Sequence, residues 1–357
     1  MGATPVRTSV ASLASDSVAE ALDSRPLAQP ASPPLVSVLV PAYNADRWID
    51  ATLRSLRSQT YRTLEIIVID DGSTDRTRAI VREHAAVDGR VLLICQDNAG
   101  VAAARNRGLA EASGKYIAPT DADDLSAPTR IALLVDALER AGLEVGVAYS
   151  WSALIDEDGW TIGVPPRPEF AGDVRSAMYD YNFVSNGSAA MMRADALREV
   201  GGYDSTLRAR DAQGCEDWAL LLALAEHHRF VCVPEFLLGY RQSSAAMSND
   251  RSRMLRSFDM VGAQHAKRYP PARKALRIAR KKALAMTLQD ALYRQRPWTV
   301  ARLALRMAMK SPFWTGKVLF PYVSHLTRSE PAPASPFDII GGEADRHPFA
   351  IGDPDQA

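Results

Sequence analysis

The first 150 residues alternate between apolar runs and amphipathic stretches, and this alternation limits the possible folds more than any other feature. Each apolar run has the length of a buried strand, and the stretches between them place apolar residues at helical spacing. Such alternation predicts an α/β fold with a mostly parallel, Rossmann-like sheet covered by helices on both faces. The predicted strands are 35–40, 64–69, 91–95, 115–119 and 145–150.

Polar side chains cluster directly after four of these strands. Pro41 is expected to end the first strand, because proline cannot continue a central ladder. The carboxyl ends of parallel strands meet at one edge of the sheet, so the clusters are expected to line a single crevice. They are Tyr43-Asn44, Asp70-Asp71, Gln96 to Asn98 and Asp121 to Asp124.

The acidic stretch from Asp121 to Asp124 places three carboxylates within four residues. Like charges this close repel one another unless a cation joins them. A hard divalent cation that also binds phosphates would satisfy them, since such ions prefer oxygen ligands. An isolated stretch of this kind is more often a solvated turn, but the other polar strand ends favour a binding site here.

After Trp151 the pattern becomes less regular. The sequence predicts a hairpin turn at 156–159, a strand at 188–192 with a helix after it, and two strands at 230–233 and 236–240. Glu216 and Asp217 stand at the start of a further predicted helix. Acidic residues there can simply complement the helix dipole, which is the alternative to a catalytic role.

The C-terminal part is strongly basic, although the whole chain balances 42 basic against 42 acidic residues. From Lys267 to Arg328 there are fifteen cationic residues and a single carboxylate, Asp290. This predicted helical segment either packs on the rest of the protein as a solvated face or binds an anionic membrane surface. No nucleic-acid partner is expected, because no recognised module is present.

No signal peptide and no apolar run long enough to span a bilayer are found in the sequence. The three cysteines are few, scattered and odd in number, which is typical of buried thiols in a reducing compartment. We therefore expect a cytoplasmic protein. The alternative is a protein attached peripherally to the inner face of the membrane.

Several motifs, taken together and in order, give the chain a family resemblance between about Leu35 and Gln242. It resembles the family 2 glycosyltransferases, inverting enzymes with the GT-A fold. The motifs are Val38 to Asn44, Val68 to Asp75, Asn98-Ala99-Gly100 with Ala104 to Gly108, the acidic stretch at the position of the metal-binding DxD, Glu216-Asp217-Trp218 at the position of the ED motif, and Tyr240-Arg241.

The resemblance implies a nucleotide-sugar donor, expected to be linked to UDP or dTDP, and a Mg²⁺ or Mn²⁺ ion held by Asp123 and Asp121. Asp123 is expected to coordinate the ion directly, with Asp121 nearer the ribose or a metal-bound water. Asp124 could instead cap the following helix. Arg105 either contacts the diphosphate or is a solvated arginine on a helix. Arg241 either contacts a phosphate or only pairs with a carboxylate. The implied donor-site residues are Pro41, Ala42, Tyr43, Asn44, Asp70, Asp71, Asn98, Arg105, Asp121 and Arg241.

On the acceptor side the resemblance implies Asp217 as the base that takes the hydroxyl proton, with Glu216 as its neighbour or substitute. The acceptor is expected to be a glycan or a polyprenyl-linked molecule, in cell-surface polysaccharide or glycolipid synthesis. Processive members carry a QxxRW motif, which Gln295-Arg296-Pro297-Trp298 does not match. One sugar is therefore expected per encounter.

The resemblance also divides the chain. The predicted parts are a disordered tail at 1–34, a nucleotide-sugar-binding half at 35–150, an acceptor-binding half at 151–245, a basic helical extension at 246–330 and a flexible tail at 331–357.

Three other functions compete with sugar transfer. A nucleotidyltransferase would need a glycine-rich, basic phosphate loop after the first strand, and Pro41 to Asn44 is not one. A phospho-receiver module would leave the region around Glu216 unexplained. A catalytically inactive, glycosyltransferase-like scaffold is the third alternative, against which the intact Asp121, Asp123 and Asp217 argue.

Overall fold

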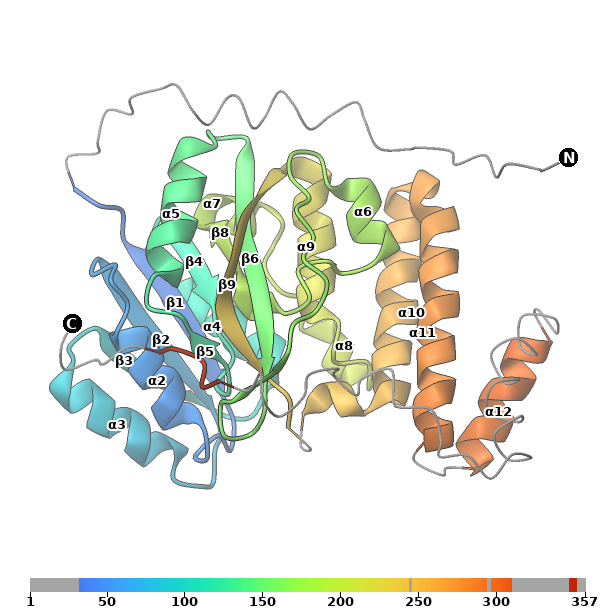
Figure 1. The fold of residues 1–357 in the computed structure, drawn as a ribbon, viewed down its shortest axis with the longest axis horizontal. Coiled ribbons are helices and arrows are strands. Elements are labelled where there is room, and N and C mark those ends of the chain that lie inside the picture. The colour runs from blue at the N-terminus through green and yellow to red at the C-terminus, as the bar shows by residue number, and fades with distance from the viewer. Residues whose placement is uncertain (1–31, 244–245, 294–296, 310–346, 352–357) are drawn as a thin grey trace, which may run out of the picture.

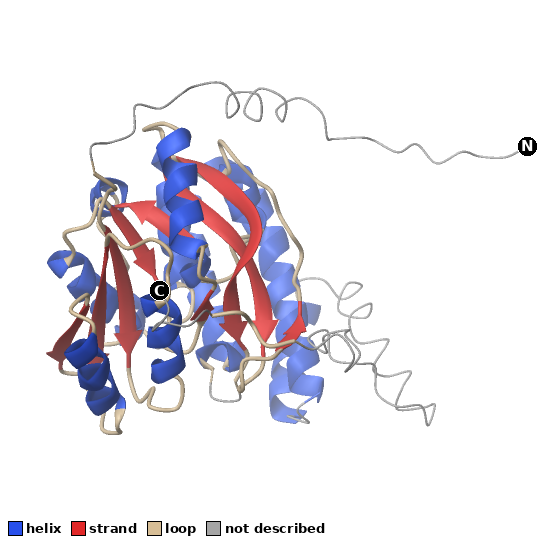
Figure 2. Cartoon of the chain, turned by 60° about the vertical axis from the view of Figure 1, so that its left-hand side comes forward, coloured by secondary structure: helices blue, strands red, loops and turns tan. Residues whose placement is uncertain are grey.

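A computed structural model of the protein describes residues 32–243, 246–293, 297–309 and 347–351. In these residues a single sheet runs through the molecule with helices on both of its faces (Figures 1 and 2), so the predicted α/β class is confirmed. The strand order is β3-β2-β1-β4-β8-β6-β9-β5, and β7 pairs with β6 alone.

The first half of the sheet is parallel, as predicted. β1 lies between β2 and β4 and runs parallel to both, and β3 adds to the outer edge of β2. The elements are β1 (Val36–Ala42), α2 (Ile49–Arg57), β2 (Leu64–Asp71), α3 (Thr77–Val87), β3 (Val91–Gln96), α4 (Val101–Glu111) and β4 (Tyr116–Pro119).

The second half is mixed. β8 lies between β4 and β6 and is antiparallel to both, so the fifth predicted strand, β6, is not a direct neighbour of β4. The elements are β5 (Leu125–Ser126), α5 (Arg130–Arg140), β6 (Val145–Ile155), β7 (Thr161–Gly163), α6 (Arg175–Asp180), the 3₁₀ helix η2 (Gly187–Ala189), β8 (Ala190–Arg193), α7 (Ala194–Glu199), α8 (Thr206–Ala209), α9 (Glu216–His227) and β9 (Arg229–Arg241).

Two strand boundaries differ from the prediction. β1 continues through Pro41, which pairs with Ile69. On the other side of β1, β4 pairs only with Val36 to Leu39. The N–H that Pro41 lacks is therefore not needed for a hydrogen bond to β4. The strands predicted at 230–233 and 236–240 are the single strand β9, whose register against β6 shifts around Pro234 and so accommodates it as a bulge.

Both faces of the sheet are buried under helices. Along β1, Val36, Val38 and Val40 belong to one apolar cluster and Leu39 to the other, because successive side chains of a strand point to opposite faces. Helices α2 and α5 cover the first cluster, and α4 and α9 cover the second. The continuous apolar strands of the sequence are thus explained by burial on both sides.

The predicted helical extension consists, in the described part, of α10 (Arg251–Arg268), α11 (Arg273–Tyr293) and α12 (Pro297–Ala308). In Figure 1, α10 and α11 stand side by side next to α6 and α9. The ring of Phe258 on α10 stacks on Trp218 of α9, with centroids 4.7 Å apart. Asp259 of α10 pairs with Arg280 of α11. The extension is therefore packed against α9.

Residues 347–351 lie against the hairpin that joins β6 to β7. The backbone N–H of Phe349 donates to the carbonyl of Gly159 (3.1 Å), and that of Thr161 donates to His347 (2.9 Å). Most of the two predicted tails, 1–31 and 331–346 with 352–357, lies outside the described residues, as does 310–330 of the extension.

No helix in the described ranges is both long enough and apolar enough to cross a bilayer. The prediction of three buried thiols was wrong for one of them. Cys215 is buried and Cys232 is half-buried, but Cys95 is exposed because it lies near the end of the edge strand β3.

Candidate active site

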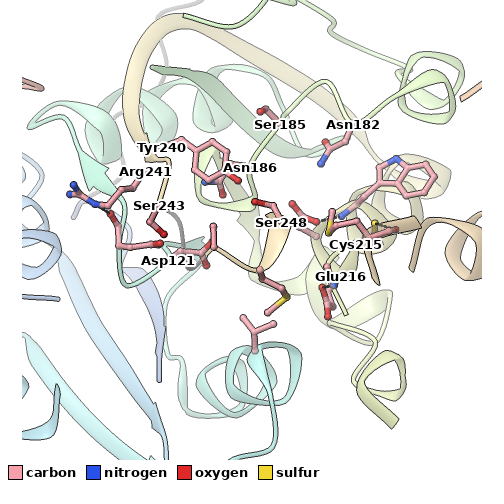
Figure 3. Close-up of a pocket in the computed structure, with 18 of the residues that line it drawn as sticks. Asp121, Asn182, Ser185, Asn186, Cys215, Glu216, Tyr240, Arg241, Ser243 and Ser248 are labelled. Carbon is pink, nitrogen blue, oxygen red and sulfur yellow. Dashed lines mark hydrogen bonds between the residues drawn. The ribbon is translucent and has the colours of Figure 1, made fainter. Parts of the chain in front are cut away.

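The carboxyl ends of the parallel strands open into two adjoining hollows. A cleft of about 820 Å³ is lined by Asp121, Asp123 and Asp217 among others, and a smaller hollow of about 280 Å³ is lined by Asp71 and Asn98. Both are lined by Pro41, Tyr43 and Val101, so they are parts of one crevice. Figure 3 shows Asp121 and Arg241 on one side of the cleft and Cys215 and Glu216 on the other.

The two aspartates at the end of β2 have different surroundings. Asp71 lines the smaller hollow, and its carboxylate accepts hydrogen bonds from the backbone N–H groups of Ala99 and Gly100, both at 2.8 Å. Asp70 is fully buried and binds Arg78, with Nε 2.5 Å from Oδ2. Asp70 lines neither hollow, so of the pair only Asp71 reaches the crevice.

Asn44 and Gly72 bring the loops after β1 and β2 together. Asn44 lines the main cleft, but its side-chain oxygen accepts a hydrogen bond from the backbone N–H of Thr74 (2.9 Å). Gly72 has a φ of +82°, and a Cβ at that position would lie 2.9 Å from the backbone nitrogen of Asn98. A side chain at residue 72 would therefore push Asn98 out of place.

Asp121 and Asp123 both face the main cleft. The carboxylate of Asp121 forms an ion pair with Arg105, and its backbone N–H donates to Ser188 Oγ (2.9 Å). The Asp123 carboxylate accepts no hydrogen bond from any other residue in the described ranges. Burial, and then the charge of Asp121, raises the pKa of Asp123 to about 6. A cation bound here would remove this repulsion.

Asp124 does not cap the next helix. Helix α5 begins at Arg130 and its cap is Thr129, which is too far along the chain. Asp124 is instead fully buried, where it accepts hydrogen bonds from Asn186 Nδ2 (2.7 Å) and from the backbone N–H of Arg241 (3.1 Å). Burial and the neighbouring carboxylates raise the pKa of Asp124 well above its usual value. Asp124 therefore lies behind the crevice and anchors the acidic stretch.

The two candidate arginines are both buried, so neither is a solvated surface residue. Arg105 lies with its guanidinium carbon 5.2 Å from the centre of the Tyr203 ring and holds Asp121. Arg241 donates to the carbonyls of Asp123 (2.7 Å), Asp156 (2.8 Å) and Glu157 (2.7 Å). Arg241 therefore joins the acidic stretch to the β6–β7 hairpin.

Glu216 and Asp217 form the first turn of α9, on the side of the cleft opposite Arg241. Asp217 is half-buried, and its carboxylate accepts from the backbone N–H of Trp218 (2.7 Å). Burial raises the pKa of Asp217 to about 6 against the opposing effect of Arg105. Glu216 is buried deeper, with one oxygen on the N–H of Gly214 (2.7 Å) and the other without a partner in the described structure. Asp217 is thus the more accessible of the two.

The motifs did not identify the turn that supports the acidic stretch. Asn186 and Ser188, at η2, bind Asp124 and the backbone of Asp121. The side-chain oxygen of Asn186 also caps η2 by accepting from the N–H of Ser188 (2.8 Å). The sequence Asn186-Gly187-Ser188 signals a turn, but nothing in it indicates which distant loop the turn contacts.

The described residues include no group of three or more His, Cys, Asp or Glu side chains arranged as a metal site. Asp121 and Asp123 supply oxygen atoms, which suit Mg²⁺ or Mn²⁺. The residues therefore fit such an ion only if other ligands come from a bound molecule or from water.

Known proteins identify the family. The sequence model of glycosyl transferase family 2 matches residues 37–201. An uncharacterized glycosyltransferase of Haemophilus influenzae is 32% identical over 231 residues, which cover 61% of this chain and 70% of that protein. The chain belongs to glycosyl transferase family 2. The putative glycosyltransferase EpsE of Bacillus subtilis, another relative, is 33% identical over 219 residues, 60% of this chain and 76% of EpsE.

Solved structures share the fold of this glycosyltransferase. The mannosyltransferase PcManGT from Pyrobaculum calidifontis, in complex with GDP-Man and Mn²⁺, aligns with a TM-score of 0.54 at 23% identity, covering 87% of each chain. Residues 1–349 of S. aureus TarS, in complex with UDP, align with a TM-score of 0.54 at 16% identity, covering 83% of this chain and 92% of that one. The predicted GT-A fold is confirmed, and the nucleotidyltransferase and receiver alternatives are removed.

Proposed function

We propose that this glycosyltransferase moves one sugar from a nucleoside-diphosphate sugar to an acceptor hydroxyl, with inversion at the anomeric carbon. The observation that carries the proposal is the single cleft that has Asp123 on one side and Asp217 on the other. In the division that we propose, residues 35–150 bind the donor and 151–245 the acceptor. We expect the product to be a cell-surface polysaccharide or a glycolipid.

On the donor side, we assign Asp71 and Asn98 to the base or ribose, with Pro41, Ala42 and Tyr43 as pocket walls. Arg105 pairs with Asp121, and we assign its charge to stabilising the negative charge that develops on the diphosphate. Asp123 and Asp121 would hold Mg²⁺ or Mn²⁺, which stabilises the diphosphate as it leaves. Asn44 and Arg241, which line the cleft, hold these loops together through hydrogen bonds, and the buried Asp70 supports them from behind.

On the acceptor side, Asp217 takes the proton of the attacking hydroxyl. The hydroxyl oxygen forms a bond to the anomeric carbon while the bond from that carbon to the diphosphate oxygen breaks. The nucleoside diphosphate departs with the bonding electron pair. Glu216, more deeply buried, supports the loop at Gly214 and so positions Asp217.

A donor screen tests the proposal. TarS is in complex with UDP and PcManGT with GDP-Man, so UDP-, dTDP- and GDP-sugars should all be offered. We expect a UDP- or dTDP-sugar to bind, and to hydrolyse slowly, only when Mn²⁺ or Mg²⁺ is present. Absence of binding to every donor, with and without metal, would contradict the proposal and return the inactive-scaffold alternative.

The rate of transfer should depend on pH because Asp217 must be ionised to accept a proton. Burial raises the pKa of Asp217 to about 6, so its carboxylate is depleted as the pH falls below that value. We expect kcat to be constant above about pH 7 and to fall about tenfold per pH unit well below 6. Protonation of Asp123 would instead raise the KM for the donor. Measuring kcat at saturating donor therefore separates the effect of Asp217 from that of Asp123. A kcat that is unchanged between pH 7 and pH 5 would contradict Asp217 as the base.

We also propose that α12 attaches the enzyme to an anionic membrane surface. One face of α12 packs on α11 through Leu303 and Met307. The opposite face exposes Trp298 (88%), Leu305 (62%) and Met309 (73%), which lie in one stripe at helical spacing. Arg302 is exposed in the same stripe. An aromatic and aliphatic stripe with cations beside it is typical of helices that lie in the bilayer interface.

Vesicle sedimentation measures this attachment. The protein should sediment with phosphatidylglycerol vesicles and much less with phosphatidylcholine vesicles. Changing Trp298 and Leu305 to serine should weaken binding by about tenfold or more, given the apolar area they would bury. Leu143→Ser is the control, since Leu143 is 82% exposed but lies outside the extension. Binding that ignores lipid charge, or that Leu143→Ser weakens equally, would contradict the attachment.

A further inference from the structure

The main cleft does not end at the catalytic carboxylates. It continues from Asp217 towards the C-terminal extension, and the part between α9, α10 and α11 is here called the distal arm. Its lining residues from the extension helices are Met254, Phe258, Ala279, Lys282, Ala283 and Met286. The whole cleft, at about 820 Å³, is in the upper part of the usual range of about 300–1,000 Å³ for small-molecule sites.

The wall that α10 and α11 give to the distal arm is apolar. Among the lining residues that the structure describes on these two helices, Lys282 alone has a polar side chain. Phe258 stacks almost parallel on Trp218, with an angle of 7° between the rings, and so joins this wall to the helix that carries Asp217. Met254 fills the space beneath Gly214, where a Cβ would lie 2.3 Å from the sulfur. Apolar side chains therefore line the cleft from α9 through α10 to α11, with Lys282 among them.

Another part of the cleft lining is more polar. It is formed by Asp180 at the end of α6 and by Asn182 and Ser185 in the segment after it, with the ring of Tyr181 between them. Figure 3 shows Asn182 and Ser185 on the far side of the hollow from Glu216. A glycan presents hydroxyl groups on all sides and would leave many of them unpaired against methionine and phenylalanine. A groove with one polar and one apolar wall suits a ligand that is itself amphiphilic.

We infer that the distal arm binds the alkyl or isoprenoid chain of a lipid-linked acceptor and thereby presents the acceptor hydroxyl to Asp217. The inference rests on the proposed transfer reaction and narrows its acceptor to one of the two expected classes. Met286 supports the inference most directly, because its large apolar side chain lines the arm and is 39% exposed. A chain lying along α11 would cover it.

Chain-length dependence tests the inference without knowledge of the true acceptor. Octyl, decyl and dodecyl β-maltosides, each below its micellar concentration, are titrated into the full-length protein and followed by tryptophan fluorescence. Each methylene that becomes buried strengthens binding by about fourfold. We expect the Kd to fall at least tenfold from octyl to dodecyl. Equal affinity for the three chains would overturn the inference.

A matched pair of variants on α11 locates the chain. Met286→Asp should remove the chain-length dependence, whereas Ile278→Asp should keep it, because Ile278 is 44% exposed on the same helix but does not line the cleft. The α12 variant, with Trp298→Ser and Leu305→Ser, should also keep the chain-length dependence. Equal losses in Met286→Asp and Ile278→Asp, or a loss in the α12 variant, would overturn the inference by moving the chain elsewhere.

Donor binding distinguishes this inference from the proposed function. Met286→Asp should bind the nucleotide-sugar donor, with metal, as tightly as the unaltered protein, since Met286 lies on the extension and not at the strand ends. Failure of every donor to bind contradicts the proposed function but leaves the maltoside titration fully measurable. Chain-length-independent binding together with normal donor binding overturns only the lipid-linked acceptor.

Discussion

Replacing Asp217 with asparagine should nearly abolish sugar transfer while leaving donor binding intact. Asparagine has almost the same shape and can still accept the hydrogen bond from the N–H of Trp218, but it cannot take a proton. General-base catalysis contributes about 10²- to 10⁴-fold, so kcat should fall by that factor. Transfer is measured with the best donor from the screen, and donor affinity by titration of the same preparation.

Stability serves as the control for Asp217→Asn. The pKa of Asp217 in the folded protein, about 6, is above the usual value for aspartate. Its protonated form therefore stabilises the fold at low pH, and that contribution is lost as the pH rises through 6. At pH 7.5 the asparagine variant should consequently melt at the same temperature as the unaltered protein or higher. A drop in Tm would show that lost activity reflects lost folding.

Glu216→Gln is the matched variant at the next position. Glu216 holds the N–H of Gly214 and is less accessible from the cleft, so its replacement should reduce kcat less than Asp217→Asn does. The assignment of the base is wrong if Asp217→Asn transfers normally. A large loss of kcat in Glu216→Gln alone would identify Glu216 as the base.

Replacing Asp123 with alanine should abolish metal-dependent donor binding. The Asp123 carboxylate faces the cleft and has no hydrogen-bond donor from another described residue, so it is free to coordinate an ion. Loss of a metal ligand should weaken donor affinity in Mn²⁺ by about a hundredfold or more. The variant should then bind donor as weakly as the unaltered protein does in the presence of a chelator.

Asp136→Ala is a suitable control for Asp123→Ala. Asp136 is an exposed aspartate on α5 that, among the described residues, pairs with Arg140 alone and does not line the cleft. Its removal lowers the net negative charge equally and should leave donor binding unchanged. Metal-dependent binding that persists in Asp123→Ala would move the ion to other ligands and would contradict the role given to the acidic stretch.

Hydrophobic periodicity was enough to predict the strands and helices of the first half. Leu64 to Ile69 is apolar except for Glu65 because β2 is buried on both faces, and the run is visible without any structure. The position of Asp71 at a strand end followed from the same pattern. The pattern could not separate Asp70 from Asp71, because which of two adjacent side chains points into the crevice depends on the register of β2 against β1 and β3.

The sequence by itself determined the α/β class, the motifs of the family and the carboxylates at Asp121, Asp123 and Asp217, since these features depend on local spacing. Tertiary structure alone decided what surrounds them. Asn186 reaches Asp124 from the turn before β8, Arg241 joins two loops, and Met286 extends the cleft onto α11. These contacts join segments distant in sequence, so they are set by how helices and strands pack, which no short pattern encodes.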